Sequence, residues 1–329
     1  MEKKKSIRIN SLNDITPIVT FLLIAVFFGV ATKGKIYSPY NLKILFDQSI
    51  TTIVAGLGMI FVIAMGGTDI TTGAVVALSG YASYLLGCRY GVIVAFVAAI
   101  LVGTFSGLVM GIVNAKYKVP SFMASLAVGA IALRGIVAVI TSKKKTEVIA
   151  TKEFLSINEM PIKLPIVLVL LVLAIYVFHY TKFGYYCRAI GENEVAVKYA
   201  GINVTKIKMI AFIISGIMGG IAGVFTVSRA GGIQSTLGTG FEMNVMMAVF
   251  VAGVPVSGGM GTKIYKLILG AFTLLILQTG MVLCGLSGSI IQGVRGIILI
   301  GVVYLSVALN KYGSSGIELK LPSLSKKSA

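Results

Sequence analysis

The sequence predicts an all-α polytopic membrane protein of about ten transmembrane helices, with a broken helix region near residues 66–73. Three observations predict this class. Hydrophobic residues make up 57% of the 329 residues and charged residues only 12%, whereas soluble domains are about 25% charged. The mean hydropathy is +0.95. Uncharged runs of about 18 residues or more, the length that an α-helix needs to cross a bilayer, recur along the chain.

The expected helices follow from these runs in chain order. Runs without any charged residue cover 15–32, 48–68, 70–88, 90–115, 164–181, 209–228, 243–262 and 267–294. Two more spans, 119–141 and 290–309, qualify if each accommodates one arginine, Arg134 or Arg295. We therefore expect a transmembrane domain over 15–310 between cytoplasmic tails at 1–14 and 311–329.

The distribution of Lys and Arg predicts the orientation. With the N-terminus inside, the inner segments carry 17 of these residues and the outer loops 10, so the positive-inside rule predicts a cell-membrane protein with both termini cytoplasmic. The outer loop 142–163 has mixed charge and is expected to be solvated. The net charge is +18. We interpret the basic residues as signals that orient the helices and as contacts for anionic membrane lipid, not as a nucleic-acid binding surface.

The longest inner segment, 182–208, contains a charged, alanine-rich stretch that predicts a short helix. Asn193 can cap its start, Glu194 lies in its first turn, and Gly201 suits a left-handed end. Glu194 and Lys198 stand four residues apart, acid first. The apolar side is expected to contain Val195, Ala196, Tyr199 and Ala200. Such a short helix needs a partner surface, which can be either the lipid interface or another protein.

The segment Gly66-Gly67-Thr68-Asp69 interrupts two apolar runs, and Thr71 and Gly73 follow it. Exposed backbone at membrane depth is tolerated only when it is packed in protein or lines an aqueous cavity. One interpretation is a broken helix pair beside a solute pathway. The other is an ordinary cytoplasmic turn with Asp69 exposed.

Arg134 lies about 15 residues into its span, where an arginine costs roughly 2.5–3.5 kcal/mol. Asp69, Glu242, helix-end carbonyls or pathway water can compensate its charge, unless it lies near the outer end and extends to water. Arg295, close to the start of the last span, is interpreted as an interfacial anchor.

Catalytic motifs are absent from the sequence. The stretch "GGMGTK" at 258–263 lacks the ending of a phosphate-binding loop, His179 is the single histidine, and three distant cysteines suggest neither a disulfide nor a zinc site. We expect a chain that is not an enzyme and binds no cofactor or metal.

Four blocks in order carry a family resemblance: "MIFVIAMGGTDITTGAVVALSGY", "NAKYKVPSFMASLAVGAIALRGI", "AIGENEVAVKYAGINVTKIKMIAFIISGIMGGIAGVF" and "AVFVAGVPVSGGMGT". From about residue 40 to 309 the chain resembles the permease subunits of ribose, xylose and galactose-type ABC importers, a family that also includes autoinducer and nucleoside permeases. Thr68 and Val195 depart from the family pattern, whereas Asp69, Gly73 and Arg134 match it.

The resemblance implies a coupling helix in the 182–208 loop that docks on a separate ATP-binding subunit. Glu194, Ala196 and Gly201 match its motif, and Lys198 lies within it. ATP and Mg would be bound by that partner. The resemblance further implies a second permease subunit, taken as a homodimer, and an extracytoplasmic solute-binding protein.

The leading hypothesis is therefore an ATP-driven importer permease for a small hydrophilic solute, a monosaccharide such as ribose. Its pathway candidates are Gly66, Gly67, Thr68, Asp69, Thr71, Gly73 and Arg134. The alternative is an ion-coupled secondary transporter that uses Asp69, Glu242 and Arg134, and a passive channel is a third option. The sequence leaves the solute open.

Overall fold

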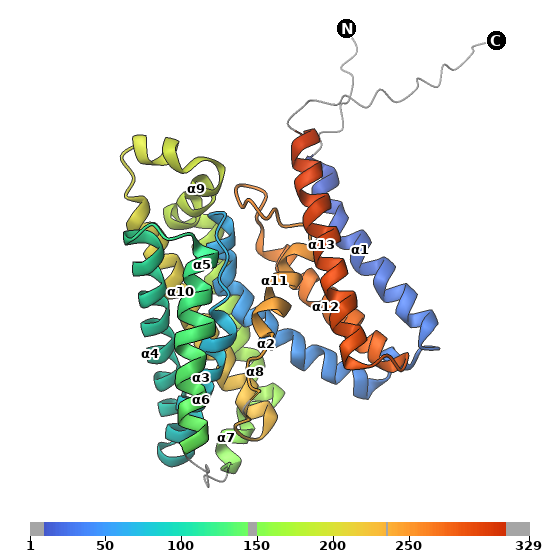
Figure 1. Cartoon of the computed structure of the whole chain (residues 1–329). Coiled ribbons are helices and arrows are strands. Elements are labelled where there is room, and N and C mark those ends of the chain that lie inside the picture. Colours follow the sequence, from blue (N-terminus) through green and yellow to red (C-terminus); the bar gives the residue numbers. More distant parts are fainter. Residues whose placement is uncertain (1–9, 144–149, 235, 314–329) are drawn as a thin grey trace, which may run out of the picture.

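The computed structural model describes residues 10–143, 150–234 and 236–313, and the regular structure in these ranges is entirely helical. The helices form a bundle in which α1 and α13 stand together at one side (Figure 1). In chain order the elements are α1 (Asn10–Ala31), η1 (Lys35–Tyr37), α2 (Pro39–Ala64), α3 (Thr72–Tyr90), α4 (Val92–Gly111), η2 (Ile112–Lys116), α5 (Ser121–Ser125), η3 (Leu126–Leu133), α6 (Arg134–Lys143), α7 (Lys152–Ser156), α8 (Met160–Ile175), η4 (Tyr176–Tyr180), α9 (Lys182–Tyr199), α10 (Val204–Ala230), α11 (Phe241–Val251), α12 (Ile264–Leu283) and α13 (Gly288–Gly313).

The expected tails at 1–14 and 311–329 lie mostly outside the described residues, and helix already begins at Asn10 and reaches Gly313. The π-helices η2, η3 and η4 continue the α-helices before them, so that α4–η2, α5–η3–α6 and α8–η4 are composite rods.

The all-α membrane class is confirmed. Among the described residues, six helical stretches are long and apolar enough to cross a membrane: Pro39–Ala64, Val92–Lys116, Ser121–Ala138, Met160–Tyr180, Val204–Ala230 and Ile264–Leu283. Helices also lie at the other expected spans, but they are not among these six stretches. The expected count of ten crossings is therefore not confirmed.

The span expected at 243–262 is wrong in its extent. Helix α11 has only 11 residues and ends at Val251. Turns follow, with Gly253, Gly258 and Gly259 at positive φ, a backbone conformation that glycine adopts without steric cost. An uncharged run here does not give a continuous helix because its glycines favour turns.

Helix α10 lies at the centre of the fold, and glycines bring α4 close to it. A Cβ on Gly103 would lie 2.2 Å from the Gly216 carbonyl oxygen, and one on Gly216 would lie 2.1 Å from that of Gly103. Gly107 approaches the carbonyl of Phe212 in the same way. Glycines recur four residues apart in both helices, at 103, 107 and 111 in α4 and at 216 and 220 in α10. This spacing forms the face on which the two backbones meet.

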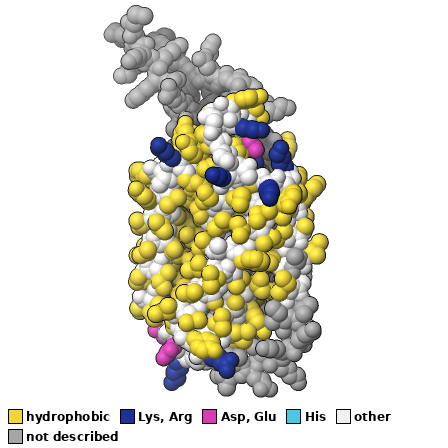
Figure 2. Space-filling view, turned by 90° about the vertical axis from the view of Figure 1, so that its left-hand side faces the viewer, with side chains coloured by type: hydrophobic (Ala, Val, Ile, Leu, Met, Phe, Trp, Pro, Cys, Tyr) yellow, Lys and Arg dark blue, Asp and Glu magenta, His cyan; other side chains and the backbone are white. Residues whose placement is uncertain are grey.

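The helices differ in how much of their surface the protein covers. Of the most apolar 18 residues of α2, 83% are buried inside the protein, whereas only 22% are buried in the corresponding stretch of the α8–η4 rod. Figure 2 shows the uncovered surface as a broad hydrophobic belt, with Lys, Arg and acidic side chains near its two ends. This distribution is the one that a bilayer requires of a spanning protein.

The loop at 142–163 is only partly the solvated segment that we expected. Residues 144–149 lie outside the described ranges, but the α7 region folds into the core, with Phe154 and Ile157 fully buried. Lys163 is also fully buried and forms an ion pair with Asp47 of α2. Its ammonium additionally donates to Asn158 Oδ1 at 3.0 Å. The expectation fails because charged residues can be buried when a partner across the fold neutralises them.

Candidate functional site

The segment between α2 and α3 turns back into the bundle, so the α2–α3 pair is a broken helix with its connection packed in protein. Gly66 makes the turn at φ 74°, and the Thr68 amide donates to Ser121 Oγ at 3.0 Å. Asp69 reaches Ser215 of α10. Ser215 lies eleven residues beyond the start of α10, which places the carboxylate roughly 16 Å below that helix end.

Asp69 is 2% exposed, so the interpretation of this segment as a turn with an exposed aspartate is wrong. Its carboxylate accepts hydrogen bonds from the Thr71 amide at 3.0 Å, from the Thr71 hydroxyl, and from Ser215 Oγ at 2.6 Å. The group therefore joins the α2–α3 connection to α10. Of the segment's pathway candidates, Gly66, Gly67 and Thr68 remain at least partly accessible, while Asp69, Thr71 and Gly73 are buried.

Arg134, at the start of α6, is held by the first turn of α11 and the residues before it. One guanidinium nitrogen lies 3.6 Å from Glu242 Oε2 and donates to the Gly238 carbonyl at 2.8 Å, and the other donates to Thr239 Oγ1 at 2.9 Å. Glu242 is thus confirmed as one of the expected compensators. The backbone carbonyl comes from the turn before α11 and not from the end of a helix. Asp69 does not compensate the arginine, because its carboxylate is occupied by Thr71 and Ser215.

Gly73 lies behind this ion pair. A Cβ at this position would come within 1.8 Å of Glu242 Oε2. The absence of a side chain at Gly73 therefore allows Glu242 to reach Arg134. Gly73 and Arg134, which both match the family pattern, thus belong to one cluster.

Arg295 is not a simple interfacial anchor. Its Nη1 donates to Asn244 Oδ1 at 3.1 Å, and Gln278 Nε2 donates to the same oxygen at 3.3 Å. This cluster joins α11, α12 and α13. Sequence inspection missed it because its members come from three separate helices.

The predicted short helix in the 182–208 segment is present. Asn193 breaks α9 with φ −159° and ψ 99°, and its side chain accepts from the Ala196 amide at 3.0 Å. Gly201 ends the helix at φ 79°, with the Ile202 amide donating to the Val197 carbonyl at 3.4 Å. Both predicted ends are confirmed, and we call Asn193–Gly201 the loop helix.

The ion pair of the loop helix differs from the expected one. Lys208 Nζ of α10 lies 2.7 Å from Glu194 Oε2, so the carboxylate pairs with the next helix and not with Lys198 one turn away. Glu194 keeps 52% of its side chain exposed. The pair is accordingly weak and solvent-screened.

The loop helix turns most of its surface away from the chain. Val197 is 7% exposed and packs with Ile190 and Val204. On its other side, Val195 is 62% exposed and Tyr199 89% exposed. This apolar side is unpartnered within the described residues and suits contact with a further component.

The first half of α9 is fixed to the bundle by the end of α2 and by the glycine-rich turns at 252–263 that follow α11. A Cβ on Gly191 would lie 2.1 Å from the Ala64 carbonyl oxygen, and Glu192 accepts from the Met260 amide at 2.8 Å. The Gly259 amide donates to Ala64 at 2.9 Å. The residues directly before the loop helix therefore contact the end of α2 and the 252–263 turns.

Nothing in the sequence indicated the role of Glu192, since its partner is 68 residues away. Cys187 in the same part of α9 is buried, and burial raises the pKa of its thiol to about 12, so it stays protonated and unreactive at neutral pH.

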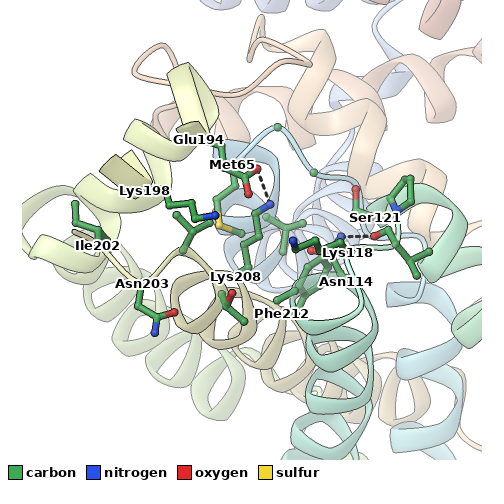
Figure 3. A pocket seen from close by; sticks show the side chains of 18 residues that line it. Met65, Asn114, Lys118, Ser121, Glu194, Lys198, Ile202, Asn203, Lys208 and Phe212 are labelled. Atoms are coloured by element: carbon green, nitrogen blue, oxygen red, sulfur yellow. Dashed lines mark hydrogen bonds and ion pairs between the residues drawn. The ribbon is translucent and has the colours of Figure 1, made fainter. Parts of the chain in front are cut away.

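A cavity of about 700 Å³ lies between the loop helix, the end of α2 and the α4–α5 turn. Figure 3 shows Lys198 and Lys208 reaching into it from α9 and α10, with Asn114, Lys118 and Ser121 on the facing side. Gly66 and Gly67 also line it. The two groups of residues predicted from sequence, the interruption and the loop helix, thus share one cavity.

Comparison with known proteins identifies the family. Residues 41–303 match the family described as the branched-chain amino acid transport system / permease component. The ribose import permease protein of Escherichia coli (strain K12) is 30% identical over 288 residues, which cover 85% of this chain and 89% of that protein. The chain is a permease of the monosaccharide ABC importer family.

Other relatives of this importer permease carry sugar names. The ribose permease of Haemophilus influenzae is 34% identical, with 70% of this chain and 74% of that protein covered. The fructose import permease of Rhizobium meliloti is 26% identical, with 82% and 78% covered. No solved structure matches the chain. Membership confirms the resemblance and identifies the chain as a multi-pass inner-membrane subunit, while the roles of individual site residues stay predictions.

Proposed function

We propose that this permease translocates a monosaccharide such as ribose into the cytoplasm, driven by ATP that a separate ATP-binding subunit hydrolyses with Mg. The observation that carries the coupling part is the loop helix. It is capped at both ends and exposes Val195 and Tyr199. The residues directly before it contact the end of α2 through Gly191 and the 252–263 turns through Glu192. Movement of this helix by a docked partner would be transmitted directly to the α2–α3 interruption.

The solute class is inferred from the relatives. Named relatives include permeases for ribose, fructose and D-allose, although the family description refers to branched-chain amino acids. We favour a sugar because those named relatives match over most of the chain. We further propose a second copy of this chain as the paired permease and a solute-binding protein on the opposite side.

The arrangement of the ends supports the proposed orientation. The start of α1 and the end of α13 lie at the same end of the bundle as α9 (Figure 1). If the loop helix meets a cytoplasmic ATP-binding subunit, both of these helix ends face the cytoplasm.

The ion-coupled alternative is weakened because the side chains proposed to bind the ion already bind other groups of the protein. Asp69 is occupied by three hydrogen bonds, and Glu242 and Arg134 pair with each other. An ion-binding carboxylate would need free oxygens aimed at a water-accessible position.

The test is transport by the full chain in lipid vesicles, reconstituted with its ATP-binding subunit and its solute-binding protein loaded with labelled ribose. We expect uptake that requires hydrolysable ATP and persists with a protonophore. If uptake occurs without the ATP-binding subunit, and an ionophore abolishes that uptake, the ion-coupled alternative is established instead.

Glu194→Lys tests the docking role and should abolish ATP-driven uptake while the protein still reaches the membrane. The matched control is the double variant Glu194→Lys with Lys208→Glu, which restores opposite charges within the chain. We expect no rescue, because the partner would still meet a lysine at position 194. Full recovery of uptake in the double variant would show that Glu194 acts only through its ion pair with Lys208 and not by docking a partner.

A further inference from the structure

The cavity beside the loop helix has an unusual concentration of positive charge. Lys118, Lys198 and Lys208 line it, and Glu194 is the one acidic residue among its lining residues. The three lysines come from the α4–α5 turn, α9 and α10, so folding brings them together. With one carboxylate against three ammonium groups, the cavity favours an anion.

One wall of the cavity is held in a specific shape. Lys118 has φ 57°, which is rare for a residue other than glycine. Asn114 Nδ2 donates to the Val119 carbonyl at 2.8 Å and closes the turn around it. The turn thereby holds Lys118 on the side of the cavity that faces Lys198 and Lys208 (Figure 3).

The same wall adjoins the surface that lipid covers. Phe122 and Met123, directly after the cavity residue Ser121, are 52% and 63% exposed. On α4, Leu101 and Phe105 are also more than 60% exposed. Phe105 lies nine residues before Asn114 of the cavity wall, about 14 Å along the helical rod. Apolar surface therefore leads from the membrane belt to the lysines.

We propose that this cavity binds the phosphate headgroup of an anionic phospholipid from the adjacent leaflet. Basic pockets between membrane helices hold such headgroups, and the exposed apolar surface of α4 and α5 accommodates acyl chains, which an acidic peptide or free phosphate would not need. The anion competes with Glu194 for Lys208. If Glu194 has the proposed coupling role, the bound lipid releases its carboxylate for the partner subunit.

The experiment measures lipid retention by the purified full-length chain, using native mass spectrometry after incubation with phosphatidylglycerol, phosphatidylcholine or inorganic phosphate. We expect retention of phosphatidylglycerol alone. The variant K118Q/K198Q/K208Q should lose affinity by about fivefold for each lysine. The control K33Q/K35Q/K43Q removes the same charge from exposed positions outside the cavity and should retain the lipid.

Two further variants separate a binding defect from misfolding. The triple Lys→Arg variant keeps the charge and should bind as the original chain does. Glu194→Gln removes the competing carboxylate and should increase retention severalfold, which a damaged fold would not produce. These lipid readouts need no ATP-binding subunit, so their failure is distinct from failure of the proposed transport function.

The proposal is overturned if both lysine triples lose lipid equally, if phosphatidylcholine is retained as well as phosphatidylglycerol, or if phosphate alone is held as tightly. It is also overturned if the cavity triple leaves lipid retention unchanged but abolishes capture of the ATP-binding subunit. In that case the lysines form a protein-docking surface.

Discussion

The two ends of the bundle each contain a Lys–carboxylate pair between separate helices, but the pairs stand in opposite environments. Near α7, Lys163 is 0% exposed and its partner Asp47 14% exposed. Near the loop helix, Lys208 is 21% exposed and Glu194 52% exposed. The first pair is part of the core and the second can exchange partners. This difference teaches that the Lys163–Asp47 pair fixes the α7 region to the core, whereas the Lys208–Glu194 pair leaves the loop helix in contact with water.

The surrounding contacts follow the same division. At the α7 end, Ser228 of α10 donates to the Phe154 carbonyl at 2.8 Å, and the Phe154 ring packs edge-on against Tyr84. At the other end, the loop helix satisfies its own backbone with Asn193 and Gly201 and leaves Tyr199 exposed. Local capping allows a segment to keep its shape while its partners change.

The largest expected effect tests the buried ion pair at the α7 end. Asp47→Ala leaves a fully buried ammonium without its charge partner and should lower the free energy of unfolding by about 3–5 kcal/mol, measured by denaturant unfolding in detergent micelles. Lys163→Ala should cost less, because Asp47 retains a route to water. Equal losses from the two variants would contradict the asymmetry in burial.

The second effect concerns the region between the two ends. Asp69→Ala leaves the Thr71 and Ser215 donors without an acceptor and should cost about 3 kcal/mol, measured by thermal unfolding in micelles. Asp69→Asn keeps an acceptor oxygen and should cost clearly less. A comparable loss from Glu153→Ala, an exposed acidic residue of α7, would show that the buried hydrogen bonds do not matter.

A smaller effect sharpens the claim that the loop helix is stabilised locally. Asn193→Ala removes its N-cap, worth about 1 kcal/mol, and should speed amide exchange about fivefold over residues 194–200. The matched control is Asn203→Ala, which removes the cap of α10, where Asn203 accepts from the Lys206 amide at 3.0 Å. Loss of protection in the loop helix from the control variant would mean that the two segments unfold together.

The smallest effect distinguishes the two ion pairs directly. A double-mutant cycle on Glu194 and Lys208 should give a coupling energy of about 0.2–1 kcal/mol that declines in high salt. The same cycle on Asp47 and Lys163 should give a larger coupling that salt barely changes. A salt-insensitive coupling at Glu194 would show that this pair is structural.

Several features were predictable because they depend on neighbours in the chain. The uncharged runs predicted most of the helices, because a helix that crosses a bilayer needs about 20 consecutive apolar residues. The run at 243–262 is the exception, since its glycines form turns. Asn193 and Gly201 predicted both ends of the loop helix, since a cap bonds to amides within three residues. Glycines four residues apart in α4 and in α10 indicate a close-packing face on each helix, since small residues at this spacing lie on one side. They do not indicate which helix packs there.

Other features required the tertiary structure. Asp69 is buried because Ser215, 146 residues later, satisfies its carboxylate. Lys163 belongs to the core because Asp47, 116 residues earlier, neutralises it. Glu194 pairs with Lys208 instead of the lysine one turn away. Sequence alone determined the membrane class, the helical segments and the ends of the loop helix, because these depend on hydrophobicity and short-range hydrogen bonds. Only folding decided which charges are buried, because burial of a charge depends on partners that distant segments bring to it.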